Sequence, residues 1–145
     1  MSDLKVAVVG LGSLGRHHLA PYLEAEEVAR IAVCDTSADA LERAKAGPRK
    51  PIATYTRLEE MLERERPDIV SITTPDHMHR AHAVTCLEAG CHVLLTKPLA
   101  TNLEDGRAIV RAAESSAGKL MLAHERRFRP FFAAIKEMLD SGALG

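Results

Sequence analysis

A lysine ends an apolar stretch near the middle of the chain. Residues Val93–Leu95 read as a buried strand, which stops at Thr96 and is followed by Lys97 and Pro98. Lysine is rarely buried without a partner, so Lys97 either marks the point where the strand reaches water or is held there for chemistry. A lysine held there can hydrogen-bond a reacting hydroxyl or carbonyl, and we expect partial desolvation to help it transfer a proton. Spacing alone leaves both readings open.

The first apolar run is followed by a glycine-rich motif, GLGSLG, at residues 10–15. Glycine at its first position permits a tight turn, the second lets backbone amides approach a pyrophosphate, and the third lets a helix pack closely on the strand. The positive end of that helix also favours phosphate. Because the motif lies between a predicted strand and a predicted helix, it favours dinucleotide binding. The expected cofactor contacts in this motif are Gly10, Gly12, Ser13, Leu14 and Gly15.

An aspartate follows the second apolar run. Asp35 lies about 20 residues beyond Gly15, at the spacing where a carboxylate accepts both ribose hydroxyls and repels a 2′-phosphate. This position, with Thr36 beside it, favours NAD over NADP. Two alternatives stay open: Asp35 merely caps the following helix, or Arg43 or Lys45 reaches the phosphate of NADP.

The fourth apolar run leads into TTPDHMH at residues 73–79, where a Thr-Pro turn can hold a cofactor with its hydroxyl and backbone amides. His77, His79 and His82 have no supporting carboxylate or cysteine cluster, so we interpret them as surface or cofactor-edge histidines and predict no metal. The sixth run leads into ERRFRP at residues 125–130. Its basic side chains either face the cofactor or a partner domain, or form a solvated turn around a buried Phe128.

Elements with regular alternation must position these residues. Apolar strands are expected at 4–9, 31–34 (begun a residue or two earlier), 52–55, 68–73, 91–95 and 120–123. Helices are expected at 13–25, at 37–46 before the Gly47-Pro48 breaker, from a Thr56–Glu59 capping box to Pro67, at 76–89 with Asp76 as cap and Gly90 after it, from a Thr101–Glu104 capping box to 117, and at 130–141. The alternation predicts an α/β fold, a doubly wound parallel Rossmann sheet of about six strands in the order 3-2-1-4-5-6 with helices on both faces. Ligands on such sheets bind beyond the carboxyl ends of the strands, where the residues above fall.

Composition limits the classes of function. The 145 residues suit one domain, 46% are hydrophobic and 27% charged, and the net charge is −1. There is no basic tract for nucleic acid and no apolar run long enough for a membrane span, and aromatic residues make up only 3%. The N-terminal residues lack a signal-peptide pattern, which predicts a cytoplasmic protein. Cys34, Cys86 and Cys91 are expected to be reduced and mostly buried.

The motifs VAVVGLGSLG, TTPDHMH, CHVLLTKPL and RRFRP, with the tail SGALG, occur in this order over nearly the whole chain. Together they resemble the glucose–fructose oxidoreductase / inositol dehydrogenase (Gfo/Idh/MocA) family of sugar oxidoreductases. The resemblance implies an N-terminal Rossmann domain that binds NAD or NADP, a C-terminal α/β substrate domain, and oxidation of a secondary alcohol of a sugar or polyol, or reduction of the ketone. The family signature is Glu-Lys-Pro, whose lysine is catalytic and lies near the nicotinamide. Matched positions here are Lys97 and Pro98 of that signature, Thr74, Pro75 and His79 of the cofactor-contacting turn, and Arg127 after the sixth strand.

The sequence departs from the family pattern in two ways. Thr96, which we count among the cofactor contacts together with Lys97 and Arg127, stands where the family has glutamate. Glu125 stands where asparagine is common. The chain also stops at Gly145, near where the substrate domain should begin, so a family histidine that exchanges the substrate's proton has no match. We therefore interpret residues 1–123 as the dinucleotide-binding domain and 124–145 as a connecting segment and helix toward an absent C-terminal domain, through which a full-length protein is expected to form homo-oligomers. A non-catalytic dinucleotide-sensing module and a biliverdin-reductase-like reductase are the alternative functions.

Overall fold

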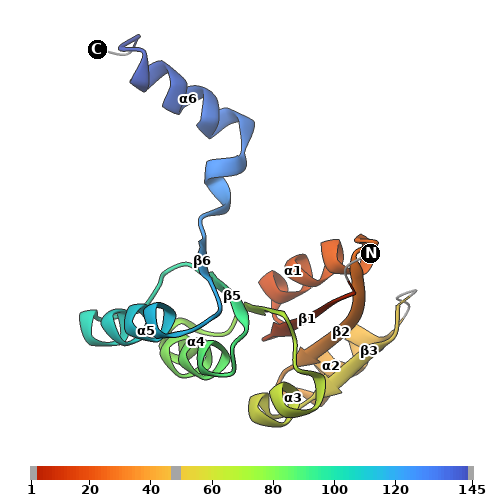
Figure 1. The fold of residues 1–145 in the computed structure, drawn as a ribbon. Coiled ribbons are helices and arrows are strands. Elements are labelled where there is room, and N and C mark those ends of the chain that lie inside the picture. The colour runs from red at the N-terminus through yellow and green to blue at the C-terminus, as the bar shows by residue number, and fades with distance from the viewer. Residues whose placement is uncertain (1–2, 47–49, 144–145) are drawn as a thin grey trace.

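The computed structural model describes residues 3–46 and 50–143, so the Gly47-Pro48 breaker and the last two residues of the SGALG tail lie outside the described residues. A parallel sheet of six strands forms its centre, in the order β3-β2-β1-β4-β5-β6 (Figure 1). The predicted α/β fold and strand order are confirmed. The strands are β1 (Leu4–Val9), β2 (Val28–Cys34), β3 (Ile52–Tyr55), β4 (Ile69–Ile72), β5 (His92–Thr96) and β6 (Leu120–Ala123).

Helices cover both faces of the sheet because its strands are apolar on both sides. On one face, Val6 and Val8 of β1 pack in a core with Leu19 of α1 (Ser13–Glu24) and Leu41 of α2 (Ala38–Lys45). A second core on the other face contains residues from three helices, α3 (Leu58–Glu65), α4 (His79–Glu88) and α5 (Leu103–Ser115). The sheet is therefore the middle of three layers. The helices cover its two faces and not the ends of its strands.

Three of the predicted helix starts are wrong. The N-cap of α3 is Arg57, which makes no side-chain capping bond, so the Thr56–Glu59 box does not form. Asp76 does not cap a long helix, because residues Asp76–Met78 form a short 3₁₀ turn, η1, and α4 begins only at His79.

The helix α5 is capped by Asn102, not by a Thr101–Glu104 box. The Asn102 side-chain oxygen accepts the backbone N–H of Asp105 at 2.9 Å. Threonine and asparagine side chains both accept backbone N–H groups well. The backbone course of the loop decides which of the two residues occupies the N-cap position. Gly90, by contrast, follows Ala89, the C-cap of α4, and has φ +81°, as predicted for a glycine just after the end of a helix.

The C-terminal part of the chain stands away from the three layers. After β6 come a short 3₁₀ turn, η2 (Glu125–Phe128), and α6 (Pro130–Asp140), which projects from the body (Figure 1). Phe131 is 70% exposed and Phe132 38% exposed, so α6 presents apolar surface. Phe128 is 73% exposed, so the predicted turn around a buried Phe128 is wrong.

All three cysteines are free and buried, as predicted. Burial raises the pKa of the Cys34 thiol to about 11, with the nearby carboxylates of Asp35 and Glu59 adding to the shift. The thiols therefore pack as small apolar groups. None of the helices in the described ranges is both long enough and apolar enough to cross a membrane.

Candidate functional site

The predicted site residues gather at one edge of the sheet. The last residues of the central strands are paired side by side, Val9 with Cys34 and with Ile72, and Ile72 with Leu95. Because all strands are parallel, the segments that follow them leave the sheet at the same carboxyl edge. These segments carry, in turn, Gly10–Gly15, Asp35–Thr36, Thr73–Pro75, Thr96–Pro98 and the chain leading to Arg127.

The glycine motif forms the turn from β1 into α1. Gly10 has φ +88°, a conformation that side chains rarely adopt, and a Cβ at Gly15 would lie 1.9 Å from the carbonyl oxygen of Gly10. Glycine is therefore required at both positions to bring the turn and the helix together. Gly12 differs, since a Cβ there would meet nothing within 4 Å. It leaves open space at the N-terminus of α1, which has no side-chain cap.

This open, uncapped helix end is suited to a pyrophosphate. The first N–H groups of a helix point outward without intrahelical partners and carry partial positive charge. Ser13 and Leu14 are exposed beside Gly12, as a cofactor-contacting segment requires. The residues present thus fit the phosphates of a dinucleotide at this place.

Asp35 lies between the glycine motif and the start of α2. One carboxylate oxygen accepts the N–H of Leu11 at 2.6 Å, and the other accepts the N–H of Ser37 at 2.8 Å. Ser37, whose hydroxyl accepts from Ala40, is the cap of α2, so the alternative that Asp35 is itself the helix cap is wrong. Each carboxylate oxygen has a further lone pair, so the group can still accept ribose hydroxyls while it fixes the glycine turn.

Thr73 is a positioning residue that the sequence did not single out. Its hydroxyl lies 2.6 Å from the carbonyl oxygen of Gly10 and 3.1 Å from that of Val9, and its N–H donates to Val9 at 2.9 Å. The end of β4 therefore holds the glycine turn. Only the pairing of β4 with β1, which are far apart in the sequence, brings these groups together.

The turn after β4 contacts two histidines of α4. The hydroxyl of Thr74 and Nδ1 of His82 are 3.0 Å apart, and burial lowers the pKa of His82, opposed by the Glu59 carboxylate. His79 is fully buried, so the interpretation of it as a surface histidine is wrong. Pro75 is exposed at the turn. In the part of the chain that the structure describes, no three histidine, cysteine, aspartate or glutamate side chains are grouped to hold a metal.

The lysine segment leaves the sheet beside this turn. Thr96 is 5% exposed and its hydroxyl donates to the carbonyl of Ile72 at 3.1 Å, so the side chain points into the sheet. Lys97 is exposed, and the Lys97–Pro98 peptide is cis. Among the described residues, none therefore supplies the expected partial desolvation of the ammonium.

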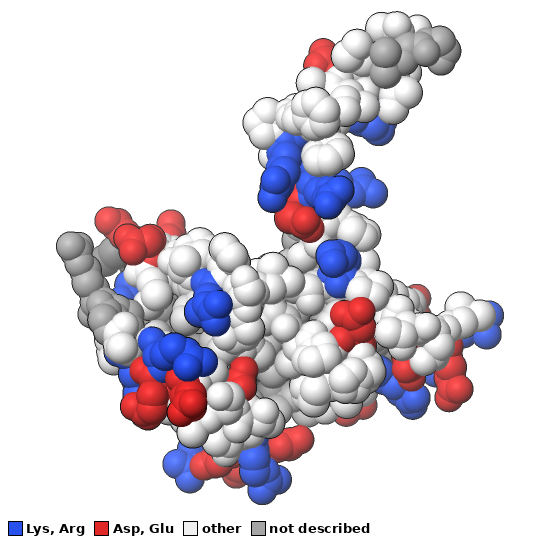
Figure 2. All heavy atoms as spheres, turned by 180° about the vertical axis from the view of Figure 1, so that it is seen from behind, with Lys and Arg blue, Asp and Glu red and all other residues white. Residues whose placement is uncertain are grey.

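Arg127 lies in η2, exposed, at the narrow connection between the sheet and α6. Figure 2 shows a group of basic side chains at this connection, where η2 contributes Arg126 and Arg127. Arg126 stacks over the Phe132 ring, 5.6 Å from its centroid. Arg127 therefore follows the carboxyl end of β6, as predicted. It lies on η2, which is separate from the glycine turn.

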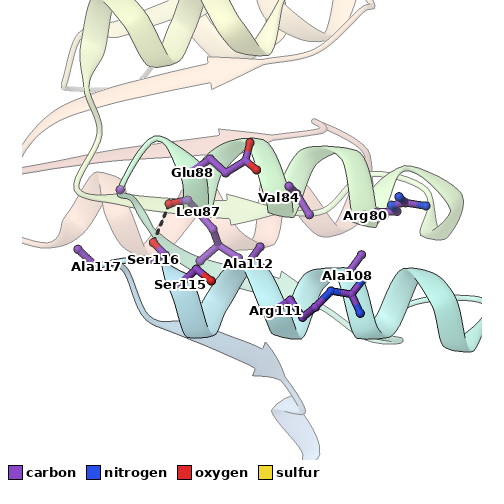
Figure 3. Close-up of a pocket in the computed structure, with 11 residues that line it drawn as sticks. Arg80, Val84, Leu87, Glu88, Ala108, Arg111, Ala112, Ser115, Ser116 and Ala117 are labelled. Carbon is purple, nitrogen blue, oxygen red and sulfur yellow. Dashed lines mark hydrogen bonds between the residues drawn. The ribbon is translucent and has the colours of Figure 1, made fainter.

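A groove of about 640 Å³ runs between α4 and α5, from Arg80 at one end to Ala117 at the other (Figure 3). Its floor includes Leu87, whose carbonyl accepts the Ser116 hydroxyl at 2.6 Å. This groove lies in the helical layer and contains none of the predicted site residues. The cofactor candidate remains the carboxyl edge of the sheet.

The strand order, the glycine turn and the acidic residue after β2 define a dinucleotide-binding Rossmann domain. Residues 4–124 match the family described as "Oxidoreductase family, NAD-binding Rossmann fold", GFO_IDH_MocA. The chain belongs to this family, and the resemblance stated from its motifs is confirmed.

Individual relatives agree with this assignment. The chain is 31% identical to D-glucoside 3-dehydrogenase of Escherichia coli over 99% of its length and 41% of that protein. It is 30% identical to scyllo-inositol 2-dehydrogenase (NADP(+)) of Bacillus subtilis, over 99% of this chain and 39% of that protein. The crystal structure of scyllo-inositol dehydrogenase from Lactobacillus casei with bound NAD(H) and scyllo-inositol superposes with a TM-score of 0.84 at 25% identity, over 99% of this chain and 43% of that chain. The chain thus spans about two fifths of the length of the relatives it matches.

Proposed function

We propose that this chain is the cofactor domain of an NAD-dependent dehydrogenase that acts on a secondary alcohol of a sugar or polyol, or on the corresponding ketone. The observation that carries the proposal is the carboxyl edge of the sheet. There, a glycine turn with open space at Gly12, the Asp35 carboxylate and the Lys97 ammonium follow three strands of one sheet. The dehydrogenases named among the relatives support the substrate class.

Each residue has a role that follows from its place. The N–H groups at the start of α1 would hold the pyrophosphate, and Asp35 would accept the adenosine ribose hydroxyls. Thr74 and Pro75 would line the nicotinamide side of the site. The cofactor, when bound, supplies or accepts the hydride. The Lys97 ammonium would hydrogen-bond the reacting oxygen and hold or release its proton at Nζ.

A second domain would complete the site. Leu94 and Met121 are directly paired across β5 and β6, and Met121 is 51% exposed. A hollow of about 310 Å³ lies there, bounded by Tyr22 of α1 and by Phe128. We propose that a substrate domain following residue 145 packs near this face and α6, covers Lys97 and excludes water from it. Cytoplasmic location and homo-oligomers formed through that domain are part of the same proposal.

The test of cofactor binding is a fluorescence titration of the purified chain with NADH and with NADPH. The chain contains no tryptophan, so the emission of the reduced cofactor can be followed directly. We expect saturable binding of NADH and weaker binding of NADPH, since Asp35 repels a 2′-phosphate. Absence of saturable binding of either nucleotide by the folded chain would contradict the proposal.

The test of the chemistry uses a protein in which this domain is joined to its substrate domain. We expect Lys97→Met to abolish turnover and to leave most of the NADH affinity in place, because other residues would hold the pyrophosphate and ribose and the Lys97 side chain is exposed. Lys119→Met is the matched control. Lys119 is also exposed but precedes β6, so it lies at the opposite edge of the sheet. Equal activities of the two variants would exclude Lys97 as the catalytic residue.

A further inference from the structure

His79 joins the two loops at the centre of the candidate site. It is the first residue of α4 and is 0% exposed. Its Nδ1 lies 2.8 Å from the carbonyl oxygen of Pro98, and its Nε2 lies 3.1 Å from the carbonyl oxygen of Thr74. These two carbonyls belong to the segments that follow β5 and β4. One buried ring therefore bridges the lysine segment and the cofactor-side turn.

The chemistry of the contacts explains why a histidine is needed. Both partners are carbonyl oxygens, which only accept, so each contact is a hydrogen bond where the ring nitrogen carries a proton. A ring protonated on both nitrogens donates to both carbonyls, and a singly protonated ring donates to one of them. A buried ring nitrogen without a partner is costly, and these contacts hold the ring and the two loops in one arrangement.

Lys97 is thereby fixed on both sides while its side chain stays free. On one side, the Thr96 hydroxyl donates to Ile72 of β4. On the other side, the Pro98 carbonyl contacts His79. The backbone of Lys97 is thus anchored to the neighbouring strand and to α4, and its exposed ammonium projects from an ordered base.

We propose that His79 is a positioning residue, which sets the Lys97 segment relative to the Thr74–Pro75 turn through its two ring nitrogens and does not itself contact the cofactor. This revises the expectation that His79 belongs to the cofactor contacts, because its side chain is enclosed beneath the turn. The effect on turnover rests on the proposed function; the bridging of the two loops does not.

The test separates the two nitrogens. The side-chain nitrogen of asparagine is as many bonds from Cα as Nδ1, and that of glutamine as many as Nε2. His79→Asn therefore keeps a donor toward Pro98, His79→Gln keeps one toward Thr74, and His79→Leu keeps neither. His77→Leu is the control, since His77 is exposed in η1, two residues away.

The first readout is backbone NMR relaxation of this chain without cofactor. We expect the exchange contribution at the Lys97 and Leu99 amides to rise severalfold in His79→Gln and His79→Leu, on the microsecond-to-millisecond timescale of loop rearrangement. It should stay near wild type in His79→Asn and in the His77→Leu control. Equal behaviour of the Asn and Gln variants, or no change in any variant, would overturn the proposal. If His79→Leu fails to fold, the Asn and Gln pair still decides.

The second readout is steady-state kinetics of the protein that carries both domains. We expect His79→Gln to lower kcat by roughly ten- to a hundredfold, as for a displaced catalytic group, and to leave KM for NAD within about twofold. His79→Asn should restore kcat. A parent protein that fails to bind NADH would refute the proposed function, whereas the relaxation experiment would still report on the bridge. A rise in KM for NAD without loss of kcat would instead make His79 part of the cofactor site.

Discussion

The Asp35 carboxylate accepts the backbone N–H of Leu11 at 2.6 Å, so the residue expected to recognise ribose also fixes the glycine turn that would hold the pyrophosphate. Leu11 itself is buried among the side chains of the α1 and α2 face. The proposed ribose contact at Asp35 and the proposed pyrophosphate contact at the glycine turn therefore depend on each other, and both depend on the packing of Leu11 in the core. A change at Asp35 has to be designed so that it alters the charge and keeps the turn.

Asp35→Asn removes the charge and keeps the contact to the glycine turn. The amide oxygen can still accept the N–H of Leu11, whereas the amide nitrogen cannot accept the N–H of Ser37, so the negative charge and that one bond are lost. We expect NADH affinity to fall by about tenfold, since charge-assisted hydrogen bonds are replaced by neutral ones, and the preference for NADH over NADPH to narrow. Fluorescence titrations with both nucleotides measure this. Asp39→Asn, an exposed acid in the first turn of α2, is the control. An unchanged preference would reduce Asp35 to an anchor of the turn.

Substitution by alanine should lower stability at Gly15 and NADH affinity at Gly12. A Cβ at Gly15 would lie 1.9 Å from a backbone oxygen, so Gly15→Ala is expected to lower the free energy of unfolding by about 1–3 kcal/mol or more. Gly12→Ala has free space and a φ of −60°, so stability should stay near wild type. The same Cβ, however, would enter the space over the end of α1, and NADH affinity should fall strongly. Urea unfolding and NADH titration of both variants check this, and a Gly12→Ala variant that binds normally would contradict the phosphate site.

The strand order could be predicted because the chain alternates apolar strands with amphipathic helices, and few topologies satisfy that alternation. Helix starts were less predictable. Thr56 and Thr101 both match a capping box, yet Arg57 and Asn102 occupy the cap positions because loop geometry selects among neighbouring candidates.

The chemical residues that follow strands could likewise be predicted, but their supports could not. The Thr73 contact to Gly10 joins residues 63 positions apart, and the His79 contact to Pro98 joins residues 19 apart. Such contacts arise only when strands are paired, and neither residue carries a local pattern that indicates them.

The hydroxyl of Thr96 is expected to stabilise the lysine segment. Thr96→Val keeps the shape of the side chain and removes the donor to the Ile72 carbonyl, so we expect a loss of about 0.5–1.5 kcal/mol in the free energy of unfolding. Thr96→Ser keeps the hydroxyl and serves as the control. Thr96→Glu loses the same bond and places a carboxylate at a position that is 5% exposed, so its loss should be larger than that of Thr96→Val. Chemical unfolding of the three variants measures the series, and a Thr96→Glu variant as stable as wild type would show that the segment opens easily.

Stability should fall as the pH is lowered through the range where histidines gain protons. Burial lowers the pKa of His82 from 6.5, with Glu59 opposing, and burial with nearby His17 lowers the pKa of His18. The unfolded chain therefore binds more protons than the folded chain between each lowered pKa and 6.5. The free energy of unfolding contributed by neutral His18 and His82 is fully present above 6.5, the pKa of histidine in the unfolded chain. It is lost as the pH falls from there through the lowered pKa values of the folded state.

The pH dependence can be assigned with a double variant. We expect the free energy of unfolding, measured with urea between about pH 8 and pH 5.5, to decrease toward the acid end in the wild type. The double variant His18→Gln/His82→Gln cannot take up these protons, so its profile should be flatter over the same range. Each single variant should lie between the two, because His18 in α1 and His82 in α4 cover opposite faces of the sheet and titrate independently. Profiles of equal slope for the wild type and the double variant would assign the acid sensitivity to other groups.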